Sequence, residues 1–182
     1  MACKIGILIY SLLQLVAFLF ILVGTPIDMF RRKDEDTLGN TPCLTLWGLK
    51  DKCYSTTYDV RVNDLFVMCP ERRDRFRAAQ AFAIIFIVIF CVECVLGFVQ
   101  LCCCTCLRWV CLALNILGIF SCIPWTLMCV MYFRNTESSS DWWRSRNCTR
   151  FNTDYKYGAG FALLVTAWCV NTVNIVFIML PC

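Results

Sequence analysis

Four long apolar segments alternate along the chain with two long polar loops and one short link. Each apolar segment is long enough to cross a hydrocarbon core of about 30 Å as a helix. The link is so short that the second and third segments must form an antiparallel hairpin. The pattern predicts an all-α membrane protein, a single domain with a bundle of four transmembrane helices. The segments are residues 5–24, 78–101, 109–133 and 157–180, the loops are 25–77 and 134–156, and the link is 102–108.

The ends of these segments carry further signals. Lys4 before an apolar run is also typical of a signal peptide. However, the run exceeds the roughly 7–15 residues of a signal core and no Ala-x-Ala site follows, so we expect a span. Pro70 followed by Glu71 favours a helix that starts there and continues into the second span. Pro124 is expected to kink the third span about one turn before the proline.

The composition supports a membrane protein and removes several classes of function. Hydrophobic residues make up 59% of the chain and charged residues 16%, whereas soluble domains average about half and about a quarter. Histidine is absent, and with it the commonest general base and metal ligand, so we expect no enzyme. The net charge of +4 is small and no basic stripe is interleaved with aromatics, which argues against nucleic acid as a partner.

The first loop contains a dense motif, Cys43-Leu-Thr-Leu-Trp-Gly-Leu-Lys-Asp-Lys-Cys53. Its two cysteines bracket alternating apolar residues, and Gly48 can adopt the positive φ of a tight turn. The spacing therefore predicts a disulfide-closed hairpin that also fixes the direction of Trp47. Strands are expected at 44–47 and 54–62, which gives the loops a β-rich cap. Two unpaired cysteines in a loop are the alternative interpretation.

This motif resembles the signature of the amastins, four-span surface glycoproteins of trypanosomatid parasites. The signature positions are Cys43, Leu44, Thr45, Leu46, Trp47, Gly48, Lys50 and Cys53. The resemblance continues in the Leu-Arg-Trp-Val-Cys-Leu-Ala-Leu-Asn run at 107–115, the Tyr-Gly-Ala-Gly-Phe sequence at 157–161 and the Leu-Pro-Cys ending. More distantly, an aromatic and a glycine near two cysteines look like the claudins. The resemblance implies a plasma-membrane protein of the parasite's intracellular stage, with a claudin-like extracellular cap and both termini inside.

Two rules conflict on which side of the membrane the loops lie. Lys and Arg number ten and five in the long loops and two elsewhere, which by a literal count places those loops in the cytoplasm. The loops also hold an even number of cysteines, suited to an oxidising compartment, and a glycosylation sequon at Asn147. We therefore expect extracellular loops and cytoplasmic termini. The loop cysteines are Cys43, Cys53, Cys69 and Cys148.

The remaining cysteines predict modification rather than metal binding. A Cys69–Cys148 bridge would join the two loops, although four cysteines allow three pairings. The link places Cys102, Cys103, Cys104 and Cys106 beside a membrane end, which is typical of reversible palmitoylation. The Cys-x-x-Cys spacings at 91–94 and 103–106 suggest zinc or redox chemistry. Because the first pair lies in a membrane helix and the two pairs are too close for a zinc ribbon, we expect no metal and no cofactor.

Polar side chains inside the apolar segments form a second group of candidates. Glu93 is the one charged residue there, and a buried acid costs several kcal/mol unless it is neutralised or paired. It is either part of a proton or cation relay with Gln14, Asn115 or Asn174, or a protonated side chain that makes one interhelical hydrogen bond. Asn115 can bond across helices, and Asn171 and Asn174 lie three residues apart on one helix face.

Two groups in the loops suggest contact with other molecules. Four arginines cluster near the outer start of the second span: Arg72, Arg73, Arg75 and Arg77. They either bind anionic lipid or an acidic partner, or they form a solvated anchor of the span. Adjacent Trp142 and Trp143 suit a membrane interface or a binding hot spot. We expect a structural and adhesive surface protein that contacts membrane lipid, another copy of itself, or a host membrane or surface protein. Proton or ion transport through the bundle is the alternative.

Overall fold

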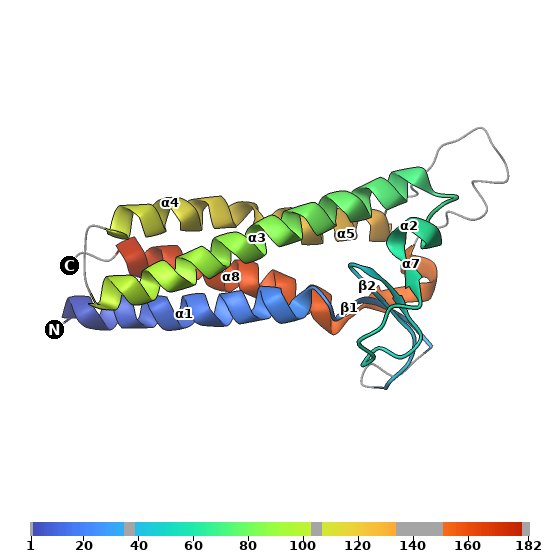
Figure 1. Cartoon of the computed structure of the whole chain (residues 1–182), viewed down its shortest axis with the longest axis horizontal. Coiled ribbons are helices and arrows are strands. Elements are labelled where there is room, and N and C mark those ends of the chain that lie inside the picture. Colours follow the sequence, from blue (N-terminus) through green and yellow to red (C-terminus); the bar gives the residue numbers. More distant parts are fainter. Residues whose placement is uncertain (1, 35–38, 103–106, 134–150, 180–182) are drawn as a thin grey trace.

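The computed structural model describes residues 2–34, 39–102, 107–133 and 151–179, and a bundle of long helices dominates it. Within those residues four helical segments are long and apolar enough to cross a membrane, which confirms the predicted four-span class. They are α1 (Ala2–Gly24), α3 (Pro70–Cys102), α4 (Arg108–Gly118) continued by α5 (Cys122–Phe133), and α8 (Ala159–Met179). Helix α1 packs against α8 and α3, α5 against α3, and α4 against α8. Figure 1 shows both termini at one end of the bundle.

The opposite end of the bundle carries a five-stranded antiparallel sheet, which we call the cap (Figure 1). The strands are β1 (Asp28–Arg32), β2 (Cys43–Thr45), β3 (Gly48–Lys50), β4 (Val60–Arg61) and β5 (Tyr155–Tyr157), in the spatial order β4-β3-β2-β1-β5. Strands β1 to β4 come from the first long loop and β5 from the second, and Phe30 pairs with Tyr157. Both loops therefore build one cap.

The strands differ from those predicted. The segment expected as a strand at 44–47 is instead a hairpin in which β2 and β3 flank a tight turn. The segment expected at 54–62 contributes only β4, because side chains bind the backbone before it: Asp59 accepts from the Asp51 N–H at 2.8 Å and Ser55 from the Thr57 N–H at 3.1 Å. Four short elements were not predicted: β1, α2 (Val62–Leu65), α7 (Phe151–Asp154) and β5.

Helix α3 begins at Pro70, where the sequence predicted a helix start, and continues unbroken for 33 residues. At 1.5 Å per residue it is about 50 Å long, well beyond a hydrocarbon core of about 30 Å. Its first two turns carry the arginines and Glu71, so these turns extend out of the apolar layer beside the cap. Helix α3 thus extends from the bundle to the cap without a break.

The third span is interrupted where Pro124 predicted a kink. A 3₁₀ turn, η2 (Ile119–Ser121), separates α4 from α5. Proline has no N–H to donate to the carbonyl four residues earlier, so the regular ladder breaks one turn before it. Trp168 of α8 donates its indole N–H to the Ile119 carbonyl at 2.9 Å and so stabilises the break.

One apolar core, which we call the main core, runs from the cap into the adjoining half of the bundle. We call this the outer half, and the half near the two termini the inner half. Buried side chains of β1, β2 and α2 join those of α1, α3, α5 and α8. Aromatic rings line the junction: Phe30 of β1 lies 5.8 Å from Tyr157 of β5, and Tyr157 lies 4.2 Å from Phe161 of α8, between ring centres. A second and much smaller apolar cluster, Tyr10, Cys111 and Ile178, lies near the other end.

Candidate functional site

A disulfide between Cys43 and Cys53 closes the β2–β3 hairpin of the cap. Thr45 fixes the turn inside it, because its hydroxyl accepts from the Trp47 and Gly48 N–H groups at 3.1 Å each and donates to the Gly48 carbonyl at 2.9 Å. Leu44 and Leu46 are buried in the main core. The motif seen in the sequence is therefore a stapled turn built around a threonine hydroxyl.

Gly48 serves the hairpin for a different reason from the one predicted. No described glycine has a positive φ, so the turn does not use the left-handed region. Instead, a Cβ on Gly48 would collide with the Val60 carbonyl of β4. The residue is a glycine because β4 passes too close for any side chain.

Trp47 is half-buried and packs against the main core, so the hairpin lies against the bundle. Gln80 of α3 donates to the Leu46 carbonyl at 2.8 Å, and the Val62 N–H donates to the Trp47 carbonyl at 3.4 Å. Much of the Trp47 ring is therefore covered by the core. The hydrogen bonds tie the stapled turn to α3 and α2.

Lys50, the basic residue of the motif, is also buried. Its ammonium lies 4.8 Å from the centre of the Tyr58 ring and 3.4 Å from the Pro26 carbonyl. Both contacts favour a cation that is shielded from water. Lys50 therefore fastens β3 to the chain that leaves α1.

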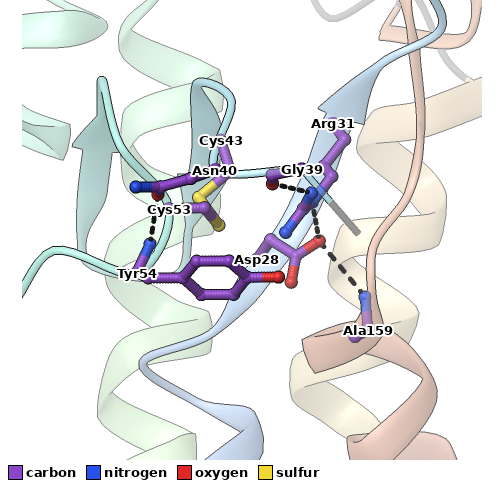
Figure 2. A network of polar contacts seen from close by, with 8 residues as sticks. All are labelled: Asp28, Arg31, Gly39, Asn40, Cys43, Cys53, Tyr54 and Ala159. Atoms are coloured by element: carbon purple, nitrogen blue, oxygen red, sulfur yellow. Dashed lines mark hydrogen bonds and ion pairs between the residues drawn. A yellow bond between two sulfur atoms is a disulfide. The ribbon is translucent and has the colours of Figure 1, made fainter. Parts of the chain in front are cut away.

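A buried ion pair that the sequence did not indicate lies where the cap meets the bundle (Figure 2). The Arg31 Nε donates to Asp28 Oδ2 at 2.6 Å, and the two side chains are only 4% and 2% exposed. Arg31 also donates to the Gly39 carbonyl at 2.8 Å, and the Ala159 N–H at the start of α8 donates to Asp28 at 3.3 Å. The pair therefore joins β1, the loop before β2 and the last helix.

Two glycines let α8 approach α1 and β1 at the same place. The Gly158 N–H donates to the Met29 carbonyl at 2.9 Å, and a Cβ on Gly158 would collide with Asp28. A Cβ on Gly160 would lie 2.6 Å from the Gly24 carbonyl oxygen and 2.9 Å from that of Asp28. We call this contact the outer clamp; it consists of Gly24, Asp28, Arg31, Gly158 and Gly160.

The cap also presents apolar side chains to solvent. Tyr54 is 65% exposed, Met68 64% and Val67 58%. Tyr54 directly follows the disulfide-bonded Cys53, and its backbone N–H donates to Asn40 Oδ1 at 3.0 Å (Figure 2). Tyr54 is therefore presented by a backbone that the adjacent disulfide and a hydrogen bond hold in place, whereas Val67 and Met68 lie between α2 and α3, beside the sheet.

The arginine cluster does not form one free basic surface. Arg72 is buried with its guanidinium 5.6 Å from the Phe66 ring centre, Arg75 pairs with Glu71, and Arg77 donates to Asn63 at 2.8 Å. Arg73 is partly exposed beside Asp74 at 3.7 Å. The cluster instead holds the segment around α2 against the start of α3.

A second candidate site lies inside the bundle, around Glu93, whose side chain is fully buried. Gln14 of α1 donates to Glu93 Oε2, and Asn174 of α8 donates to Gln14 Oε1 at 2.8 Å and to the Tyr10 carbonyl at 3.3 Å. Three helices thus meet through three polar side chains. Of the neighbours considered for Glu93, Gln14 is the one that bonds to it directly.

Asn115 and Asn171 extend this chain of hydrogen bonds to α4. The Asn115 amide donates to the Tyr10 hydroxyl at 2.8 Å and to the Cys111 carbonyl at 2.9 Å. Asn171 donates to the Asn115 carbonyl at 3.1 Å, one turn before the 3₁₀ break. We call the connected set Tyr10, Gln14, Glu93, Asn115, Asn171 and Asn174 the polar layer. Tyr10 escaped the sequence analysis because an aromatic residue in an apolar run looks like ordinary core.

Several predicted sites lie outside the part of the chain whose side chains are described. They are Trp142, Trp143, Asn147, Cys148 and the cysteines proposed for acylation, Cys102, Cys103, Cys104 and Cys106. Cys69 is disulfide-bonded. Within the described residues no three His, Cys, Asp or Glu side chains are grouped to hold a metal ion; Cys91 is exposed and Cys94 is buried.

The fold and these two sites define a multi-pass membrane protein with a stapled β cap. The chain matches the model of the amastin surface glycoproteins over residues 15–178, and it belongs to that family. The family predicted from the motif is therefore confirmed, and the chain is a surface membrane protein. No curated protein and no solved structure matches it.

Proposed function

We propose that this chain is a structural and adhesive surface protein whose cap contacts another membrane or surface protein. The observation that carries the proposal is the fixed presentation of Tyr54, which is 65% exposed and directly follows a disulfide-bonded cysteine. Large, stiff side chains on an ordered backbone supply contact area at low entropic cost. Host membranes and other copies of the chain are the partners that this role would involve.

The test compares cap variants at equal surface density. Cells or proteoliposomes that carry Tyr54→Ala and Met68→Ala should bind target vesicles of phosphatidylcholine and phosphatidylserine several-fold less than the parent. Thr56→Ala is the matched control, because Thr56 is exposed in the same loop and offers little apolar area. Attachment that is equal for the parent and the Tyr54 and Met68 variants would exclude contact through these side chains.

Trp47 provides an internal check on this assay. Because its ring packs against the core, Trp47→Ala should reduce the amount of protein at the surface. The attachment per molecule that does arrive should change little. A variant with normal surface density and lost attachment would show instead that Trp47 itself touches the target.

The contact role requires the cap to face outward, and we propose extracellular loops with cytoplasmic termini. The cap disulfide supports this arrangement, since such bonds persist in oxidising compartments. A C-terminal tag should become accessible to antibody only after permeabilisation, and Asn147→Gln should remove a glycosidase-sensitive mass shift. Antibody access to the tag on intact cells would contradict this topology.

Transport of protons or cations is the second candidate, and the buried polar layer favours it. Glu93 would carry the ion, with Gln14 and Asn174 as neighbours on α1 and α8. Proteoliposomes containing the parent should then show a flux that Glu93→Gln abolishes, whereas Glu71→Gln, at the exposed start of the same helix, should keep it. In the contact role, Glu93→Gln leaves attachment unchanged and no flux is seen with either protein.

A further inference from the structure

The polar layer contains buried oxygen atoms that no hydrogen-bond donor in the described part of the chain reaches. Four buried oxygens in it have no donor among the described residues: Glu93 Oε1 and the side-chain oxygens of Asn115, Asn171 and Asn174. All four side chains are 0% exposed. Buried polar atoms are paired in the great majority of proteins, and a bilayer supplies no bulk water to pair them. The polar layer therefore lacks a donor or a cation that would interact with these four oxygens.

The donors in the layer are already engaged. The Gln14 amide donates to Glu93, and the Asn115, Asn171 and Asn174 amides donate to the Tyr10 hydroxyl or to backbone and side-chain carbonyls. If an amide rotated so that its N–H₂ group donated to one of these four oxygens, the acceptor that it binds now would lose its donor. Turning one amide therefore exchanges one unpaired oxygen for another.

The orphan oxygens belong to one connected cluster. Glu93 is linked to Asn174 through Gln14, and Asn174 and Asn115 both bond to Tyr10, at its carbonyl and its hydroxyl. Asn171 bonds to the Asn115 backbone. The oxygens therefore come from α3, α4 and α8 and belong to one hydrogen-bonded set with Tyr10 and Gln14 of α1.

The third span gives Asn115 its place in this set. Asn115 lies in the last turn of α4, and the backbone stays helical through the 3₁₀ turn η2 into α5. The carbonyls at this turn are therefore hydrogen-bonded, and the Glu93 carboxyl is the group of the polar layer that favours positive charge.

We propose that the polar layer binds a monovalent cation of the sodium type, with Glu93 as its charge partner and the asparagine oxygens completing its shell. Oxygen-only donors suit hard cations and offer no soft ligand for zinc or copper. A single carboxylate balances one positive charge, whereas a divalent ion would leave net charge in a medium of low dielectric constant. The ion joins three helices and requires no movement across the bilayer, so this inference rests on neither function above.

The experiment measures thermal unfolding of the purified full chain in lipid nanodiscs, with sodium chloride replaced stepwise by choline chloride at constant ionic strength. A ligand that binds the folded state at a hundredfold excess over its Kd should raise the Tm by about 5–10 °C for a chain of this length, and the rise should saturate. Potassium should have a smaller effect than sodium. Equal curves in sodium, potassium and choline would overturn the proposal.

Variants test whether the sodium response arises in the polar layer. Glu93→Gln should abolish the sodium response, and Glu71→Gln should keep it. Asn171→Leu, which leaves the charge unchanged, should shift the sodium midpoint upward by at least tenfold, and it serves where Glu93→Gln does not fold. A sodium response that survives both layer variants would place the ion elsewhere. A sodium-independent parent whose Tm Glu93→Gln leaves unchanged would fit a protonated Glu93 and would reject the ion.

Discussion

Near Gly24 the first helix meets the last through backbone atoms, whereas near Gln14 the same two helices meet through side chains. In the outer clamp, a Cβ on Gly160 would lie 2.6 Å from a backbone carbonyl of α1. In the polar layer, Asn174 reaches Gln14 and Tyr10 with its amide. The backbone at the end of α1 cannot move aside without disturbing the sheet that follows it, whereas a side-chain amide can change its rotamer. The outer half of the molecule is therefore intolerant of added volume, and the inner half is adaptable.

The largest effect is expected from breaking the ion pair of the outer clamp. Asp28→Ala leaves the Arg31 guanidinium buried without its carboxylate, which should lower the free energy of unfolding by about 3–5 kcal/mol. Thermal unfolding in nanodiscs measures the loss as a drop in Tm. Asp74→Ala is the control, because Asp74 is 66% exposed and its pairs with arginine are long. Equal stability of the two variants would show that the Asp28–Arg31 pair does not hold the clamp.

Removal of the disulfide should have the next largest effect and should be confined to the cap. Replacing Cys43 and Cys53 together by Ser removes the constraint on the unfolded loop, which the entropy model puts at about 3 kcal/mol. Amide hydrogen exchange should become faster in β2 and β3 and stay unchanged in α1 around Gln14. Faster exchange in both places would mean that the cap and the polar layer unfold as one unit.

A third change tests the backbone contact directly. Gly160→Ala places a methyl group against three carbonyl oxygens, those of Gly24, Ile27 and Asp28. None of them can rotate away, so the variant should lose about 1–3 kcal/mol of stability. Ala162→Val adds volume on an exposed face of the same helix and is the control. A Gly160→Ala protein with the parent's Tm would show that α8 can move outward without penalty.

The smallest effect is expected from the equivalent change in the inner half. The Cβ of Gly118→Ala would lie 2.7 Å from Asn171 Nδ2, which is the end of a side chain. Asn171 can rotate at the expense of one interhelical hydrogen bond, worth on average about 0.6 kcal/mol in membranes. The two alanine variants should therefore differ clearly in Tm. If Gly118→Ala is as damaging as Gly160→Ala, the inner half is not adaptable.

The sequence predicted the parts of this architecture that depend on composition and local spacing. Four spans follow from hydropathy, the break in the third span from Pro124, and the closed hairpin from the spacing of Cys43 and Cys53. Glu93 and the three asparagines were recognisable because polar residues are rare in membrane helices. Their hydrogen-bond partners were not, since the partners depend on how each helix is rotated about its axis.

The outer clamp could not be predicted for a related reason. Strands β1 and β5 are five and three residues long and pair across more than a hundred residues of chain. Neither has the alternation that marks a strand over a longer run. Asp28 and Arg31 looked like ordinary loop charges, because no local pattern shows that both are buried against a helix that comes so late in the sequence.

The position of β5 has a consequence for biosynthesis. A ribosome releases β1 to β4 long before it reaches residue 155, so β1 has an open edge while the later helices are still being inserted. Open edges invite pairing with other chains. Only a chain that has been made as far as β5 can cover that edge with its own strand, which pairs with β1 from Phe30 to Arg32. Closure of the sheet thus depends on the second loop, and a chain that ends before Tyr155 keeps an open strand edge at β1.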